Sequence, residues 1–158
     1  MRRLGLLVTT GVLVLCATAF AAKPPANIHG VDPVTGKRVS LADYKGRPVV
    51  INVWGAWCSE CRAEAPDLKR FQKAHPGVAL IGIEIHDSKA DARRFYARYD
   101  QEWPSIYDPT GQLASSIGSP SAPTTFFLDR RHRVVEVIHG LGTLARFNAA
   151  YARATRAS

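Results

Sequence analysis

The sequence contains few of the residues that form permanent cross-links or metal sites. Its three cysteines are Cys16, Cys58 and Cys61, and its single methionine is Met1. No two histidines are closely paired; they are His29, His75, His86, His132 and His139. A structural zinc ion needs four ligands, and neither a second cysteine pair nor a histidine pair is present to supply them. We therefore expect no metal site and no cofactor, and the lack of methionine argues against a Met-rich metal carrier.

Acidic residues are scarce relative to basic ones. The chain has 21 lysines and arginines against 13 aspartates and glutamates, a formal net charge of +8 at pH 7. No basic motif interleaved with aromatic residues and no zinc-finger spacing accompanies this charge, so we expect no nucleic-acid partner. Six arginines allow two interpretations. They could form one patch that binds an anionic lipid or an acidic partner, or they could belong to an ordinary solvated surface. They are Arg93, Arg94, Arg98, Arg130, Arg131 and Arg133.

The N-terminus differs in kind from the rest of the chain. Met1-Arg2-Arg3 is positively charged, a mostly apolar run of 19 residues follows, and Ala19-Phe20-Ala21 within it is a small-x-small cleavage site. This pattern predicts that residues 1–22 direct export. The run is long for a cleaved signal and just long enough to span a membrane, so a cleaved signal peptide and an uncleaved membrane anchor both stay open. Cys16 lies in this segment, and Leu15 before it argues against lipidation there.

The remaining residues alternate between strand and helix patterns. Two runs rich in Val and Ile show little polar alternation, which is typical of strands buried on both faces: Pro48–Trp54 and Val78–His86. Amphipathic spacing and capping residues predict helices over Ser59–Ala74, 88–99, 112–117 and 144–154. Turn residues predict hairpins from Asn27–Val31 with Lys37–Ser40 and from Thr124–Asp129 with Val134–His139, and a loop with a short strand over Gln101–Tyr107. We expect an α/β fold with a mixed central sheet flanked by helices.

Two cysteines stand three residues apart where the first buried strand gives way to a helix. If Cys58 begins that helix and Cys61 lies one turn later, their side chains share a face and can form a disulfide. The helix N-terminus carries about half a positive charge, which stabilises a thiolate at Cys58 and lowers its pKa from the free value of about 8.5. We therefore expect Cys58 to be the attacking sulfur and Cys61 the resolving one. A fixed structural disulfide is the alternative, although closing so short a loop removes little entropy from the unfolded chain.

Four segments of the chain resemble a known family. They are Gly36–Gly46 leading into Val50–Trp54, then Trp57–Cys61, Glu64–Pro66 and Ala122–Phe126. Together they make residues 27–155 similar to the TlpA-like family of exported thiol-disulfide oxidoreductases of the ResA and DsbE type. The resemblance implies a thioredoxin-like domain over residues 23–158 with an N-terminal hairpin extension. It also implies export to the periplasm or another extracytoplasmic compartment.

The resemblance implies roles for two further residues. Pro123 would be a cis-proline that lies against the cysteine pair. Asn52 stands where thioredoxin carries a buried acid, and the reductase branch of the family places an acid at the position of Glu64 instead. Glu64 is three residues beyond Cys61 on the same helical face, where a partly desolvated carboxylate would have a raised pKa and could shuttle the proton of Cys61. A solvent-exposed helix glutamate is the alternative.

These features lead to a functional hypothesis. We expect a monomeric enzyme that reduces disulfides in extracytoplasmic proteins, for example apocytochrome c, and receives electrons from a membrane or exported donor. The Ser59-Glu60 dipeptide lacks the proline common in the family, and an inward-pointing Glu60 carboxylate would make the pair more reducing. The loop before Pro123 lacks the acidic fingerprint of dedicated cytochrome c maturation proteins, which weakens the case for that substrate. The alternatives are a copper carrier that uses Cys58 and Cys61 as soft ligands and a binding module without redox chemistry.

Overall fold

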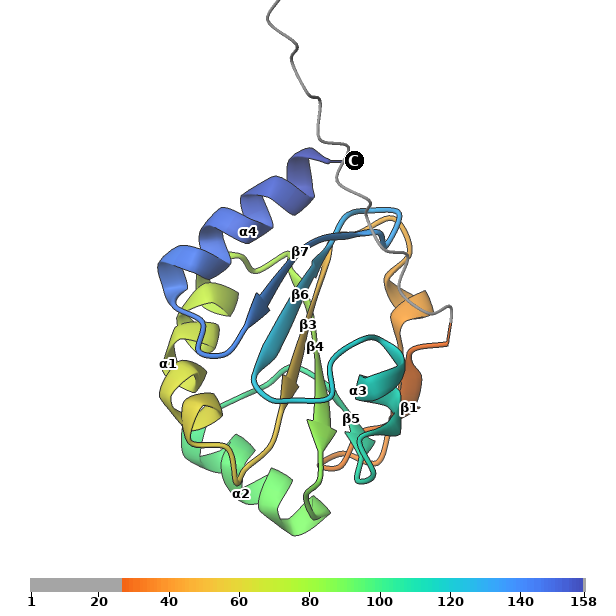
Figure 1. The fold of residues 1–158 in the computed structure, drawn as a ribbon, viewed down its shortest axis with the longest axis vertical. Coiled ribbons are helices and arrows are strands. Elements are labelled where there is room, and N and C mark those ends of the chain that lie inside the picture. Colours follow the sequence, from red (N-terminus) through yellow and green to blue (C-terminus); the bar gives the residue numbers. More distant parts are fainter. Residues whose placement is uncertain (1–26, 158) are drawn as a thin grey trace, which may run out of the picture.

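A five-stranded mixed sheet forms the centre of the structure, a computed structural model that describes residues 27–157 (Figure 1). Its strand order is β5-β4-β3-β6-β7, and its strands are β3 (Val49–Trp54), β4 (Ala79–Ile85), β5 (Ser105–Asp108), β6 (Thr124–Leu128) and β7 (Val134–His139). β4 runs parallel to β3 and to β5, while β6 is antiparallel to β3 and to β7. The predicted α/β fold with a mixed sheet is confirmed. The predicted export segment, residues 1–22 with Cys16, lies outside the described residues.

Helices and an N-terminal hairpin cover the two faces of this sheet (Figure 1). The helices are α1 (Ser59–Ala74), α2 (Lys89–Tyr99), α3 (Gln112–Ser116) and α4 (Leu144–Arg156). The hairpin pairs β1 (His29–Val31) with β2 (Arg38–Ser40) and leads into the short 3-10 helix η1 (Leu41–Tyr44). Within residues 27–157, no helix has both the length and the apolar character that crossing a membrane requires.

The central strands are buried because both of their faces are covered. Every residue of β3 and β4 is buried. Val50 points toward α1 and α4, in a cluster with Phe71 and Phe147. Its neighbours Val49 and Ile51 belong to a second cluster with residues of the hairpin, η1 and α3. Since successive side chains of a strand point to opposite faces, a continuous Val and Ile run is what a doubly covered strand requires.

Capping side chains start three of the helical segments. Ser40 accepts a hydrogen bond from the Ala42 amide at η1, Ser88 from the Asp91 amide at α2, and Thr143 from the Arg146 amide at α4. Each side-chain oxygen thereby satisfies an amide that has no partner inside its helix. Apart from β5, which was predicted only as a short strand somewhere within Gln101–Tyr107, the predicted strand and helix boundaries lie within two residues of those observed.

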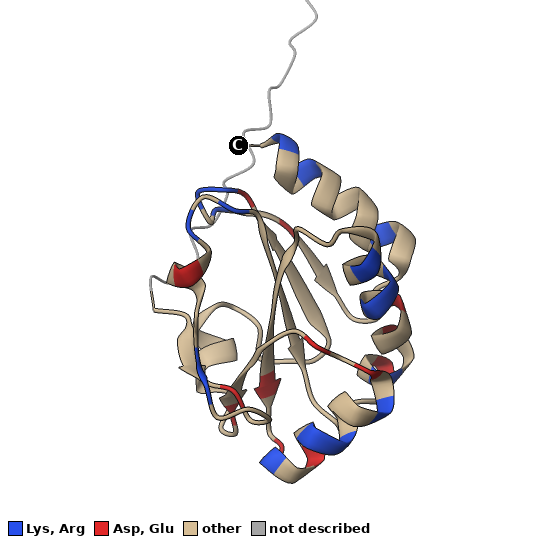
Figure 2. Cartoon of the chain, turned by 180° about the vertical axis from the view of Figure 1, so that it is seen from behind, with Lys and Arg blue, Asp and Glu red and all other residues tan. Residues whose placement is uncertain are grey.

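The six arginines do not form a single patch, and that interpretation is wrong. Arg93, Arg94 and Arg98 belong to α2, at one end of the molecule, while the β6–β7 turn that carries the other three lies at the opposite end (Figures 1 and 2). In that turn Arg133 forms an ion pair with the buried Asp129. The arginines of α2 are therefore a separate surface, next to the start of α1.

Candidate active site

Cys58 and Cys61 lie where β3 leads into α1, and they form a disulfide with a Cα–Cα distance of 5.2 Å. Cys58 is the N-cap residue of α1, and the backbone amide of Cys61 donates to its sulfur at 3.0 Å. This amide is one of the donors that a helix N-terminus leaves without a partner. The predicted placement of Cys58 at the helix start is confirmed, and the geometry favours negative charge on its sulfur in the reduced protein.

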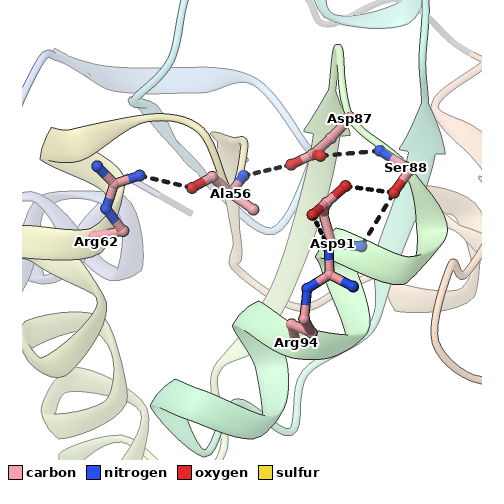
Figure 3. A network of polar contacts seen from close by, with 6 residues as sticks. All are labelled: Ala56, Arg62, Asp87, Ser88, Asp91 and Arg94. Atoms are coloured by element: carbon pink, nitrogen blue, oxygen red, sulfur yellow. Dashed lines mark hydrogen bonds and ion pairs between the residues drawn. The ribbon is translucent and has the colours of Figure 1, made fainter.

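The segment before Cys58 is fixed by contacts on both sides. The amide of Ala56 donates to Oδ2 of Asp87 at 2.6 Å, and its carbonyl accepts from the guanidinium of Arg62 at 2.7 Å (Figure 3). Asp87 also accepts from the amide of Ser88, at the start of α2. Asp87 and Arg62 thus hold the loop that positions the first cysteine.

Trp57 is the exposed neighbour of the disulfide. Its side chain is 52% exposed, although the indole Nε1 donates to the carbonyl of Ile85 at 3.1 Å. A Cβ on Gly55 would lie 2.5 Å from this Nε1, so only glycine allows the indole to cross the loop. The ring is therefore held as a fixed apolar surface beside the otherwise buried cysteines.

The inner side of the disulfide is apolar. Cys58 and Cys61 pack in one cluster with Trp54, Ala65 and Phe95 and with other residues of α2, and Ala122 packs against this cluster. The Ala122–Pro123 peptide bond is cis, the isomer that the family resemblance implies. Pro123 is buried, and its carbonyl accepts from the amide of Gly140 at 2.9 Å, which ties the loop to the end of β7.

Glu64 lies one turn beyond Cys61 and is buried, with only 1% of its surface exposed. Its Oε1 accepts from Nδ2 of Asn52 at 2.9 Å, and its Oε2 accepts from the amide of Gly142 at 2.9 Å. The Asn52 amide group also donates to Oγ1 of Thr125. The interpretation of Glu64 as a solvent-exposed helix residue is therefore wrong.

The surroundings of Glu64 favour its protonated form. Burial raises the pKa of Glu64 to about 7, and the hydrogen bonds from Gly142 and Asn52 offset only part of this effect. The negative charges of Glu60 and Asp67 raise the pKa further. A carboxyl group with a pKa near neutrality can both release and accept a proton at physiological pH.

Glu60 is a solvent-exposed acid between the two cysteines. It is exposed in the first turn of α1, and its Oε2 lies 3.6 Å from the position that a Cβ on Gly140 would take. Solvent therefore screens the Glu60 carboxylate, which weakens its expected effect on the reduction potential of the pair.

Three residues of this site escape sequence reasoning. Gly142 supplies a donor to Glu64 from 78 residues away, and a Cβ there would lie 2.2 Å from the ring of Phe147. Thr125 and Asp87 likewise act through long-range contacts. Only Asp87 left a local signal, because it follows the predicted strand Val78–His86 and precedes Ser88, which caps α2. Within residues 27–157, no three His, Cys, Asp or Glu side chains gather to hold a metal ion.

Comparisons with known sequences agree with this geometry. A family model described as the AhpC/TSA family matches residues 16–137. The thiol-disulfide oxidoreductase ResA of Bacillus thuringiensis subsp. konkukian is 30% identical over 112 residues, 70% of this chain and 65% of that protein. The thiol:disulfide interchange protein DsbE of Pseudomonas aeruginosa is 37% identical over 107 residues, 65% of this chain and 58% of that protein. The chain thus spans less than two thirds of the length of these relatives.

Solved structures show the same fold. A secreted thiol-disulfide isomerase from Corynebacterium glutamicum superposes with a TM-score of 0.73 at 32% identity, over 81% of this chain and 82% of that one. A DsbF homologue from Corynebacterium diphtheriae superposes with a TM-score of 0.74 at 36% identity, over 80% and 83%. The predicted thioredoxin-like fold is confirmed by these similarities.

Proposed function

Since the chain belongs to the AhpC/TSA family and is a thioredoxin-fold protein of the ResA and DsbE type, we propose that it is a thiol-disulfide oxidoreductase that reduces disulfides in exported proteins. The observation that carries this proposal is the Cys58–Cys61 disulfide at the N-terminus of α1, with the Cys61 amide directed at the Cys58 sulfur. A pair held this way can open and close with little movement of the backbone.

The reaction begins with the reduced protein. The Cys58 thiolate attacks one sulfur of a substrate disulfide, the substrate S–S bond breaks, and one substrate cysteine leaves as a thiolate that takes up a proton. Cys61 then loses its proton and attacks the Cys58 sulfur in the mixed disulfide, which releases the second substrate cysteine. Two electrons pass from the dithiol to the substrate disulfide. The protein is left with the Cys58–Cys61 disulfide, and an external dithiol must reduce it again.

Glu64 serves the second step. When Cys61 attacks, its thiol proton must go to a base, and Glu64 lies one turn away on the same face of α1. Its pKa of about 7 suits a group that takes this proton and later returns it. Cys58 and Cys61 are then the catalytic residues, Glu64 the proton-transfer group, and Pro123 a positioning residue behind the pair.

The finer assignments rest on the relatives and on the N-terminal sequence. Export is supported by the apolar segment in residues 1–22 and by the secreted C. glutamicum neighbour. We place the reaction in the periplasm or another extracytoplasmic compartment, with a membrane or exported electron donor and a monomeric enzyme. An apocytochrome c is one substrate that the family resemblance implies.

Trapping of mixed disulfides tests the proposal. In Cys61→Ser the resolving thiol is missing, so Cys58 should stay attached to a disulfide-containing substrate peptide, whereas Cys58→Ser should trap none. Equal trapping by both variants would contradict the assigned roles. A reduced protein that binds copper through both cysteines but exchanges with no disulfide would refute the oxidoreductase and favour the copper carrier.

A further inference from the structure

A hollow of about 270 Å³ lies between the start of α1 and α2. Arg62 from α1 and Arg94 and Arg98 from α2 line it, and the aromatic rings of Phe95 and Tyr99 contribute to its wall. Arg62 also holds the loop before Cys58, but disulfide exchange at Cys58 and Cys61 needs neither Arg94 nor Arg98. Their convergence on one hollow therefore calls for another role.

The charges around the hollow do not balance. Asp91 is the only carboxylate among its lining residues, and it forms an ion pair with Arg94 (Figure 3). Arg62 donates to a neutral acceptor, the Ala56 carbonyl. Arg98 lies over the ring of Tyr99, 5.8 Å from its centre, and has no ion-pair partner within residues 27–157. Two positive charges in the hollow are thus left without a carboxylate.

Neither cysteine lines the hollow, but Ala56, Phe95 and Tyr99 link it to the apolar cluster that contains both cysteines. Ala56, which also lines it, stands two residues before Cys58, and Arg62 directly follows Cys61. Phe95 belongs both to the wall of the hollow and to the apolar cluster that packs against the two cysteines. A group bound here would lie next to whatever is attached to Cys58 during exchange.

We propose that this hollow binds an acidic side chain of the polypeptide substrate, close in sequence to the cysteine that Cys58 attacks. The proposal rests on the proposed function and adds a substrate preference to it. A guanidinium group matches a carboxylate in geometry as well as in charge, and it is more weakly hydrated than an ammonium group. A polypeptide is the occupant because Phe95 belongs both to the wall of the hollow and to the cluster around the disulfide, where a substrate chain must lie during exchange.

Two disulfide peptides test this preference. They are identical except that glutamates flanking one cysteine in the first are glutamines in the second. The rate of reduction by the reduced full chain is measured for each, and the ratio of rates is divided by the same ratio measured with dithiothreitol, which corrects for the intrinsic reactivity of the peptides. We expect the wild-type protein to favour the acidic peptide by about three- to tenfold at low salt, with the preference shrinking as salt screens the charges.

Single substitutions locate the source of the preference. Arg98→Gln and Arg94→Gln should each lower the corrected ratio by about two- to threefold, and Arg94→Gln should have the larger effect because it also leaves Asp91 unpaired. The matched control is Arg93→Gln, an exposed arginine of α2 that does not line the hollow, and it should preserve the ratio.

Three results would overturn the inference. A corrected ratio of one in the wild-type protein shows no preference for acid. If Arg93→Gln lowers the corrected ratio as much as Arg94→Gln and Arg98→Gln do, the preference comes from the overall charge of α2 and not from the hollow. If neither peptide is reduced by protein whose two thiols are intact, the proposed function itself fails and the substrate preference fails with it.

Discussion

Replacing Glu64 with glutamine should lower the pKa of Cys61. Side chains three residues apart on a helix lie about 6 Å from each other between Cβ atoms. At an effective dielectric constant of about 20, unit charges at that separation interact by roughly 3 kcal/mol, or about two pKa units. The pKa of Glu64 is about 7, so its carboxylate is ionised throughout the range in which an unperturbed thiol titrates. It therefore opposes a second negative charge on Cys61, and Glu64→Gln should lower the pKa of Cys61 by one to two units.

The assay must separate two thiols that titrate together. Cys58→Ser leaves Cys61 as the one active-site thiol, and ultraviolet absorbance of the thiolate against pH then reports its pKa. The comparison is between Cys58→Ser alone, with Glu64→Gln, and with Glu60→Gln as the matched control. Glu60 is an exposed acid on the same helix, so solvent screens it and its replacement should shift the pKa by a few tenths of a unit at most. Equal shifts from the two substitutions would refute the coupling of Glu64 to Cys61.

The stability of the protein supplies a second readout of Glu64. Its folded-state pKa lies above its unfolded value, so its contribution is fully present below pH 4.5 and is lost as the pH rises through about 7. The shift corresponds to roughly 3 kcal/mol. Glutamine resembles the protonated carboxyl group and does not ionise, so the stability of Glu64→Gln should fall less than that of the wild type as the pH rises. Denaturant unfolding at pH 5 and pH 8 measures the change in the free energy of unfolding. Equal changes in the wild type and the variant would contradict the raised pKa of Glu64.

Three further predictions concern other parts of the chain. Asp87→Asn should lower the free energy of unfolding by about 1–3 kcal/mol, because the amide of either Ala56 or Ser88 then loses its acceptor. Urea unfolding measures this loss, with Asp43→Asn as the control because Asp43 is exposed. An equal loss of stability in both variants would contradict the prediction. Burial together with the charges of Asp87, Asp91 and Asp32 raises the pKa of Glu84 from 4.5 to about 8, so the stability of the wild type should fall relative to that of Glu84→Gln as the pH rises from 4 to 9. Identical pH curves from thermal unfolding of the two proteins would count against this. Residues 1–22 should direct export, and cell fractionation that finds the full-length chain in the cytosol would exclude it.

The sequence predicts the main elements of this fold because their signals are local. The Val and Ile run of β3, the helix pattern of α1 and the cysteine pair between them each lie within one short segment. β5 was harder to place, because its four residues begin with a serine and owe their strand geometry to pairing with β4. Periodicity within a segment cannot show such pairing.

The sequence predicted the relations between site residues on α1, but not the contacts that other elements make with them. Glu64 could be placed near Cys61 from spacing, but its burial depends on Asn52 of β3 and on Gly142 before α4. The arginines of α2 and of the β6–β7 turn looked equivalent in sequence, and only the fold separates them. Glu84 left a signal that could have been followed: an acid between two isoleucines of a strand predicted to be buried on both faces must itself be buried.

Glu64 and Glu84 show why burial alone does not assign a role to an acid. Both are buried and both have raised pKa values. Among the residues that the structure describes, Glu84 has no hydrogen-bond partner for either oxygen, so no donor there stabilises its ionised form. Glu64 has a donor at each oxygen, and these donors keep its pKa near neutrality despite nearly complete burial. The Nδ2 group of Asn52 also donates to the hydroxyl oxygen of Thr125. Asn52 therefore keeps a hydrogen-bond acceptor whether Glu64 is ionised or protonated. Since a proton-transfer group must be stable in both protonation states, Glu64 meets the requirement, while Glu84 is suited only to remaining protonated.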